Sequence, residues 1–135
     1  HLSIRRQRQM CIRDRTDHAK NLLARALCGR LPSLPASIFA ALGTGGADAT
    51  GVTGEPAGNG YARQRVTFTG TGPQRNLSAF SFTFTAAAGT LSHLGLFDAA
   101  TGGNALTWAP LSAAVTVAGP GTVTVAADAL TVTPE

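Results

Sequence analysis

The sequence contains little charge, few aromatic residues and almost no cysteine. Charged residues make up 13% of its 135 positions and aromatic residues 6%. The two cysteines, Cys11 and Cys28, are too few and too isolated for a disulfide framework or a zinc site. No run of apolar residues approaches the roughly 20 that a membrane-spanning helix requires. We therefore expect a protein that is made in a reducing cytoplasm and binds no membrane.

Small residues take the place of the missing charge. Ala, Gly and Thr dominate, and the pattern is not that of a chain kept disordered by its charge. A composition of this kind favours a β-rich fold with many turns. A chain of this length is expected to bury a core without disulfides or metals.

The positive net charge of +4 comes from one short segment. Residues 1–15 contain five arginines and one aspartate, whereas residues 16–135 carry six basic and six acidic side chains. Within that segment, residues 5–15 (RRQRQMCIRDR) resemble translated sequencing-adapter sequence. We predict that residues 1–15 are non-native and that residues 16–135 form a single domain. The alternative is a basic arm that contacts nucleic acid.

One helix is predicted at the start of this domain, over residues 16–28. The side chain of Thr16 or Asp17 can accept a hydrogen bond from the free backbone N–H groups of the first turn. Leu23 and Leu27 lie four positions apart and supply an apolar stripe.

Alternation of apolar and polar residues predicts strands over most of the remaining chain. The clearest case is residues 77–86, where Phe80, Phe82 and Phe84 point to one side. Further strands are expected at 37–42, 61–69, 90–97, 105–109, 114–118, 122–126 and 129–133. Residues 43–60 show neither period, so we expect a long loop there. The fold class predicted is all-β, an antiparallel sandwich or jelly roll of about seven or eight strands with one N-terminal helix.

Residues 90–110 predict a β-hairpin on which the core is centred. The turn between its strands runs from Asp98 to Asn104, where Gly102 and Gly103 supply positive φ without steric cost. Pro110 lacks a backbone donor and is expected to end the second strand. This hairpin holds the only tryptophan and one of the six phenylalanines, so the hairpin is expected to anchor the core.

No catalytic or cofactor site is predicted. Ser92, His93 and Asp98 are the residue types of a nucleophilic triad, but they lie too close along one strand to converge. Histidines and carboxylates are scattered, so no metal site is expected. The segments GTGGAD (43–48) and GTGPQR (70–75) lack the lysine and the following helix of a phosphate-binding loop. We therefore predict no enzyme activity, no cofactor and no metal.

Tyr61, Arg63 and Arg65 share one predicted face of the 61–69 strand. Two arginines on a neutral domain are too few for a nucleic-acid surface, so a solvent-exposed or subunit-facing strand is favoured. A weakly charged domain associates readily, and its strand edges need cover. We predict that these three residues lie at or near a subunit contact, where the arginines reach carboxylates or carbonyls of a neighbour.

Two motifs in a fixed order resemble a known family. The segment GNGYARQRVTF (58–68) is followed by LSHLGLFDAATGGNALTWAPL (91–111) and by ALTV (129–132). This order resembles a family of small tailed-phage and prophage proteins, described as tail-fibre-like or minor capsid proteins. The resemblance covers most of residues 16–135. It implies a structural role in the virion and brings no catalytic residues with it.

We therefore predict a structural protein of a tailed phage virion, either a minor capsid or decoration protein or a tail-associated component. The expected partners are other virion proteins and further copies of the chain, with no nucleic acid and no membrane. The protein would be made in the cytoplasm of the bacterial host and end in the virion. The alternative is a receptor- or carbohydrate-binding module of a tail fibre, for which Tyr61 and Trp108 are the aromatic candidates.

Overall fold

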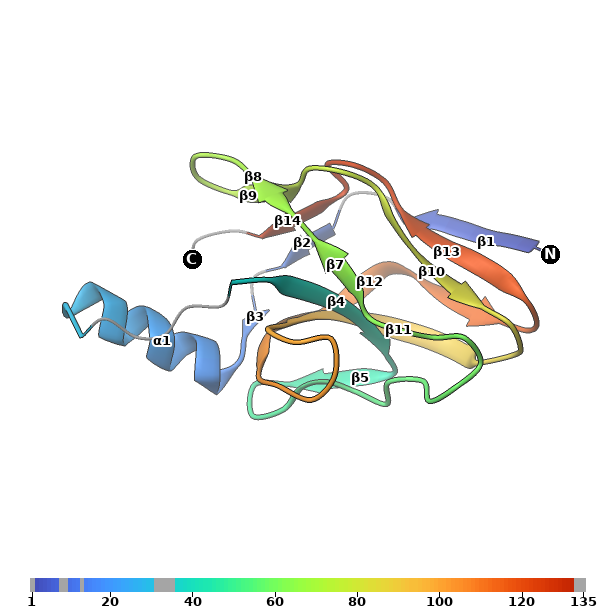
Figure 1. The fold of residues 1–135 in the computed structure, drawn as a ribbon, viewed down its shortest axis with the longest axis horizontal. Helices are drawn as coiled ribbons and strands as arrows, with labels where there is room; N and C mark the ends of the chain where they lie inside the picture. The colour runs from blue at the N-terminus through green and yellow to red at the C-terminus, as the bar shows by residue number, and fades with distance from the viewer. Residues whose placement is uncertain (1, 8–9, 13, 31–35, 133–135) are drawn as a thin grey trace.

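The computed structural model describes residues 2–7, 10–12, 14–30 and 36–132. These residues form strands in four sheets and one helix, α1 (Asp17–Leu27) (Figure 1). The predicted fold class, mostly β with antiparallel sheets and a single N-terminal helix, is confirmed. The described residues form fourteen strands, more than the seven or eight predicted. Three of the additional strands precede α1, two lie in the predicted loop 43–60 and one lies at Gln74–Asn76. The predicted strand 61–69 is divided into two, whereas the predicted strands 105–109 and 114–118 form one.

Two sheets enclose the main core. The larger has the order β3 (Asp14–Arg15), β12 (Ala105–Val117), β11 (Gly89–Phe97), β4 (Ile38–Gly43) and β7 (Gln64–Val66). The smaller has the order β1 (Leu2–Gln7), β13 (Gly121–Val125) and β10 (Phe80–Phe84). Apolar side chains from both sheets pack in one cluster, so this part of the fold is sandwich-like.

Two further sheets complete the described strands. One has the order β2 (Met10–Ile12), β14 (Leu130–Val132), β9 (Gln74–Asn76) and β8 (Phe68–Thr69). The other is a hairpin of β5 (Gly45–Ala47) and β6 (Gly51–Thr53). Among the described helical residues, none form a helix long and apolar enough to cross a membrane.

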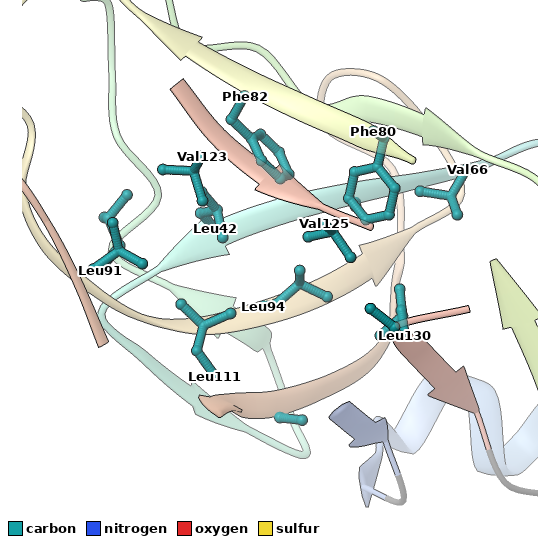
Figure 2. Packing of buried hydrophobic residues seen from close by; sticks show 14 of the residues in the cluster. Leu42, Val66, Phe80, Phe82, Leu91, Leu94, Leu111, Val123, Val125 and Leu130 are labelled. Carbon is teal, nitrogen blue, oxygen red and sulfur yellow. The ribbon is translucent and has the colours of Figure 1, made fainter. Parts of the chain in front are cut away.

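The three phenylalanines of β10 belong to the main core cluster, and Figure 2 shows Phe80 and Phe82 among the packed side chains. Phe82 and Phe84 are 0% and 1% exposed, and Phe80 packs edge-on against Phe82. Val123 and Val125 of the paired strand β13 lie on the same side and are also fully buried. The prediction that the three phenylalanines of the 77–86 strand point to one side is therefore confirmed. Burying each of these rings contributes about 1.5–3 kcal/mol to folding.

The predicted helix is also confirmed. Thr16 is its N-cap, and its hydroxyl accepts a hydrogen bond from the backbone N–H of Ala19 at 3.2 Å. Gly29, with φ +72°, follows the C-cap residue Cys28 and has the left-handed conformation that ends many helices. Only Ala19 and Leu22 of α1 are buried, and both pack toward Leu106 of β12.

The hairpin of β11 and β12 forms as predicted and supplies side chains to the main core, but one detail is wrong. Pro110 does not end β12, which continues to Val117. Strand β3 pairs with β12 only at Thr107 and Trp108. At Pro110 the edge of β12 on the β3 side therefore has no described partner strand. The missing N–H of Pro110 interrupts no hydrogen bonds between strands on that side. Trp108 does not join the main core. It packs with a smaller cluster of Ala41, Val52 and Phe97.

The predicted loop 43–60 is wrong in its first half, which forms the β5–β6 hairpin. Its glycines let backbone approach other groups closely: a Cβ on Gly46 would lie 2.5 Å from Cε3 of Trp108. Gly95 of β11 is equally constrained, since its Cβ would lie 2.6 Å from Cγ2 of Val52. Periodicity could not reveal these strands, because contact through backbone leaves no alternation of side chains.

Residues before Thr16 pair with the sheets through their backbones. β1 runs parallel to β13, β2 runs parallel to β14, and β3 runs antiparallel to β12. Backbone pairing does not depend on side-chain identity, so this arrangement leaves the origin of the segment open. That residues 1–15 are non-native stays a prediction.

A buried amide links the sheets on the side of β14. Asn76 is 0% exposed, and its Nδ2 donates to the carbonyls of Ser78 at 3.0 Å and Ala126 at 2.8 Å. Its Oδ1 accepts from the backbone N–H of Leu130 at 2.9 Å. The side chain thereby satisfies backbone groups before β10, after β13 and at the start of β14, and a buried polar group of this kind needs all its partners.

We predict that Phe82→Ala lowers the free energy of unfolding by about 3–5 kcal/mol, because it leaves a cavity between the two sheets. Thr83→Ala is the matched control, since Thr83 is the next residue of β10 and is exposed. Chemical denaturation of both variants measures the difference. Equal stability of the two variants would show that this face of β10 is not the core.

Candidate functional site

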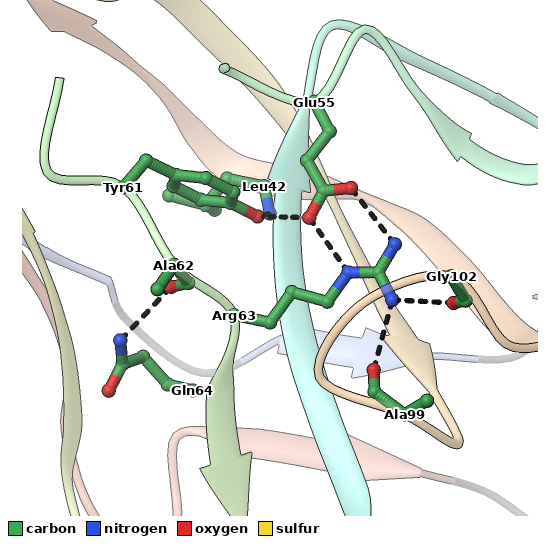
Figure 3. Close-up of polar contacts among 8 residues, drawn as sticks. All are labelled: Leu42, Glu55, Tyr61, Ala62, Arg63, Gln64, Ala99 and Gly102. Carbon is green, nitrogen blue, oxygen red and sulfur yellow. Dashed lines mark hydrogen bonds and ion pairs between the residues drawn. The ribbon is translucent and has the colours of Figure 1, made fainter. Parts of the chain in front are cut away.

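One polar cluster joins three segments that are far apart in the sequence: the chain after β6, the chain before β7, and the turn between β11 and β12 (Figure 3). Tyr61 supplies its inner side. Its Oη donates to Oε2 of Glu55 at 2.6 Å and accepts from the backbone N–H of Leu42 at 3.0 Å. The ring stacks on Phe82 and Phe84, each with 6.0 Å between ring centroids. Tyr61 therefore connects the cluster to the core.

Arg63 occupies the centre of the cluster. Its Nε donates to Oε2 of Glu55 at 2.8 Å and its Nη2 to Oε1 at 3.0 Å, which is a bidentate ion pair. Its Nη1 donates to the carbonyls of Ala99 and Gly102, both at 2.9 Å. The guanidinium carbon lies 3.8 Å from the ring centroid of Phe97, a cation–π geometry. With a side chain 9% exposed, Arg63 is committed to its own chain.

The turn that Arg63 holds is also closed from within. Oδ1 of Asp98 accepts from the backbone N–H of Asn104 at 2.7 Å, and Oδ2 accepts from its Nδ2 at 3.2 Å. Gly103 has φ +72°, and a Cβ there would overlap Oδ1 of Asp98. The predicted role of the glycines is confirmed, since positive φ at Gly102 and Gly103 lets the chain curl around the guanidinium.

The cluster fixes the charge state of its acid. Burial opposes ionisation of Glu55, but hydrogen bonds from Arg63 and Tyr61 outweigh it and hold the pKa of Glu55 below its ordinary value. Burial first, and then the bond to Glu55, raise the pKa of Tyr61. At neutral pH the site therefore contains a carboxylate, a guanidinium and a neutral phenol, and none is poised to exchange a proton. This arrangement suits a structural contact rather than acid–base chemistry. We call Glu55, Tyr61 and Arg63 together the clamp.

A cavity of about 290 Å³ opens beside the clamp. It is lined by Glu55, Pro56, Tyr61, Ala62, Arg63, Ala100, Thr101 and Gly102. The polar atoms of its three large side chains bind one another or the backbone of the same chain. These polar atoms are thus already hydrogen-bonded within the domain, so the cavity offers no specific evidence for a bound ligand.

A second polar contact holds α1 and the β5–β6 hairpin against Trp108. Oδ1 of Asp48 accepts from Nε1 of Trp108 at 2.9 Å, and Oδ2 accepts from Nζ of Lys20 at 2.8 Å. The bond from Lys20, followed by that from Trp108, lowers the pKa of Asp48. Trp108 is therefore engaged at its nitrogen by Asp48 and at its ring by Gly46, and it is not a free platform for a sugar ring.

The structure separates the three predicted contact residues. Only Arg65 lies on strand β7, where it is exposed, whereas Tyr61 and Arg63 precede the strand and turn inward. The predicted continuous strand over 61–69 is wrong, since the residues form β7 and the short β8. Sequence reasoning missed Glu55. A lone acid in a glycine-rich segment, six and eight positions before Tyr61 and Arg63, was the available signal.

The other sequence candidates do not assemble. Oγ of Ser92 lies 2.8 Å from Nδ1 of His93, but both carboxylate oxygens of Asp98 are bonded by Asn104. Across the described part of the chain, no three His, Cys, Asp or Glu side chains gather as a metal site would require.

Comparison with known protein families gives a match over most of the chain. The model of a family described as podophage GP4 fiber I protein gp80 matches residues 15–133. The match covers nearly the whole chain, includes α1 and the clamp, and leaves out residues 1–14. No curated protein matches the chain.

We predict that Glu55→Gln lowers the free energy of unfolding at neutral pH by about 1.5–3 kcal/mol, the range for hydrogen bonds to charged groups. Because the pKa of Glu55 is lower in the folded state, its contribution is present above its ordinary value of 4.5 and is lost as the pH falls through the folded value. The difference in the free energy of unfolding between wild type and variant should therefore become smaller in acid, as measured by denaturation at a series of pH values. Asp128→Asn, at an exposed carboxylate 4.0 Å from Arg75, should show no such gap at any pH. A gap that stays constant into strong acid would contradict the ionised clamp.

Proposed function

The chain belongs to the podophage GP4 fiber I protein family, and from this premise we propose that its β7 edge contacts a neighbouring tail component. As a phage fibre protein it is a structural, tail-associated part of the podophage virion. Structural proteins of this kind act by packing against their neighbours, so the question is which surface does so.

The observation that carries the proposal is the position of Arg65. Strand β7 lies at the end of its sheet and, among the described strands, pairs only with β4. Edge strands present unpaired N–H and C=O groups, which a partner can complete. Arg65 is the exposed charge at the middle of this edge, opposite Phe39 of β4. A guanidinium there can reach carboxylates or carbonyls of a neighbour.

The clamp lies next to the β7 edge and is a second observation in favour of the proposal. Tyr61 and Arg63 hold the chain that leads into β7, and they attach it to the core and to the 98–104 turn. The edge is thereby fixed before any partner arrives, which reduces the ordering cost of binding. In this proposal Arg65 makes the contact, while Tyr61 and Arg63 position the strand.

We predict that Arg65→Glu weakens retention of the labelled protein on purified tail particles several-fold, because a charge at an interface chiefly sets encounter and register. Arg75→Glu is the matched control, with the same charge change at an exposed arginine of β9. Pull-down with particles of the phage that encodes the protein, together with thermal melts of both variants, measures the effect. Equal retention of wild type and both variants would mean that β7 is an ordinary solvent-facing edge.

The boundary of the fibre domain is a second part of the proposal. We propose that the domain begins at residue 15, where the family match begins. Residues 2–7 and 10–12 lie along the outer edges of β13 and β14, so other strands need not rearrange when they are removed.

We therefore predict that a chain lacking residues 1–14 keeps its cooperative melt, with a midpoint lowered by no more than a few degrees. Thermal melts of the full and shortened chains followed by circular dichroism provide the measurement. Loss of the cooperative transition would show that these residues belong to the folded domain.

A further inference from the structure

The outer edge of strand β13 is occupied by residues from outside the family match. Strand β1 pairs in parallel along the whole of β13, from Leu2 opposite Gly121 to Gln7 opposite Val125. Figure 1 shows β1 on the outer side of β13, with β10 on the other side. The family match begins at residue 15, so β1 does not belong to the matched part of the chain. The structure therefore shows an edge of the matched domain with an added strand in place.

The position next to β13 covers part of the main core. Val123 and Val125 of β13 are 0% exposed and belong to the main core cluster. Strand β1 also lies beside β12, whose second half supplies Leu111, Val115 and Val117 to the same cluster. A strand added at this edge extends the smaller sheet over the larger one, so the residues on its inner face meet apolar surface.

The residue types of β1 do not fit this position. Residues that pair across neighbouring strands share a face of the sheet, so a residue paired with Val123 or Val125 belongs to the inner face. The register brings Arg5 to Val123 and Gln7 to Val125. Arginine and glutamine are costly at such positions, because burying a polar group without a partner opposes folding. An apolar residue at each of the two positions suits the edge better.

The pairing of β2 with β14 does not have this mismatch. Met10 pairs with Leu130, and Ile12 pairs with Val132, so apolar residue types meet at both positions. The mismatch is therefore a property of the β13 edge. A competing strand has to displace β1 alone, and β2 can remain in place while it does so.

The described part of the chain contains no spare strand for this edge. Outside the helix and the strands, the described residues form turns and loops rich in glycine and alanine, and no such segment alternates apolar and polar residues over six positions. A second copy would have to break one of its own sheets to supply the strand, and its β1 carries the same mismatch. The occupant that fits the edge is therefore an extended segment of a different protein.

We propose that the outer edge of β13 is a strand-acceptor site, at which an extended segment of another tail protein displaces β1 and pairs with β13. That segment carries an apolar residue at each position paired with Val123 and Val125, and a polar residue between them. In strand addition of this kind, main-chain hydrogen bonds supply affinity and alternate side chains supply specificity. The proposal rests on the proposed function only in taking the partner to be a tail component, and the site is separate from the β7 edge.

Matched substitutions in β1 of the full chain test the demand for apolar residues. Arg5→Val should raise the midpoint of the thermal melt by a few degrees, because it puts an apolar residue at the position paired with Val123. Arg6→Val is the matched control, since the same exchange one residue later is paired with Thr124 and should leave the midpoint unchanged. Equal midpoints of the two variants would overturn the proposal.

A synthetic peptide of residues 2–7 with valine at positions 5 and 7 tests strand addition directly. Its host is the full chain with Arg6→Pro, because proline removes a backbone donor and weakens the pairing of the chain's own β1. The valine peptide should bind this host saturably and about tenfold more tightly than the peptide of unchanged sequence, as measured by fluorescence anisotropy. A thermal melt verifies that the host is folded. Absence of saturable binding, or equal binding of the two peptides, would contradict the proposed site.

Retention on purified tail particles tests the identity of the partner. The double variant Arg5→Val with Gln7→Val closes the edge with the chain's own strand, so its retention should fall several-fold below that of Arg6→Val. Equal retention, or a loss of self-association in sedimentation instead, would overturn the assignment of the edge to another tail protein. Arg65→Glu reports on the β7 edge in the same assay. The peptide measurement uses no particles, so it distinguishes failure of this site from failure of the proposed function.

Discussion

The guanidinium of Arg63 is the group through which the loops of this domain hold one shape. It binds Glu55 with two hydrogen bonds, two carbonyls of the 98–104 turn, and the face of Phe97. Glu55 and the 97–104 segment are far apart in the sequence and share no strand pairing. Planar donors at fixed angles suit this task, because one side chain can satisfy a carboxylate and two carbonyls at once. Remove the guanidinium and the turn keeps only its internal Asp98–Asn104 bonds.

The clamp is connected through Tyr61 to the apolar core between the two sheets. Tyr61 transmits the position of the clamp to Phe82 and Phe84 by stacking, while its hydroxyl is held by Glu55 and by the backbone of β4. The polar cluster and the apolar core are thus one connected unit. A fibre component has to present rigid surfaces to its neighbours, and this connection gives the β7 edge a fixed support.

The contact proposed at the β7 edge depends on direction and charge. Strand β7 pairs only with β4 among the described strands, and its exposed Arg65 can donate directional hydrogen bonds to a tail component. The near-neutral charge of residues 16–135 leaves little repulsion to oppose such a contact.

The sequence alone determined the parts of this protein that depend on local chemistry. Thr16 as a helix cap, the alternating phenylalanines of β10, and the glycines of the 98–104 turn follow from side-chain period and backbone preference, and two ordered motifs indicated the phage family. Tertiary structure decided the rest. Tyr61, Arg63 and Arg65 seemed to share a face by alternation, but the chain before β7 is not a strand, so the first two turn inward to Glu55 and the third does not. The β5–β6 hairpin was equally hidden, because Gly46 and Gly95 act by having no side chain where Trp108 and Val52 approach. Contacts between distant segments, and contacts made through bare backbone, leave no periodic signal in a sequence.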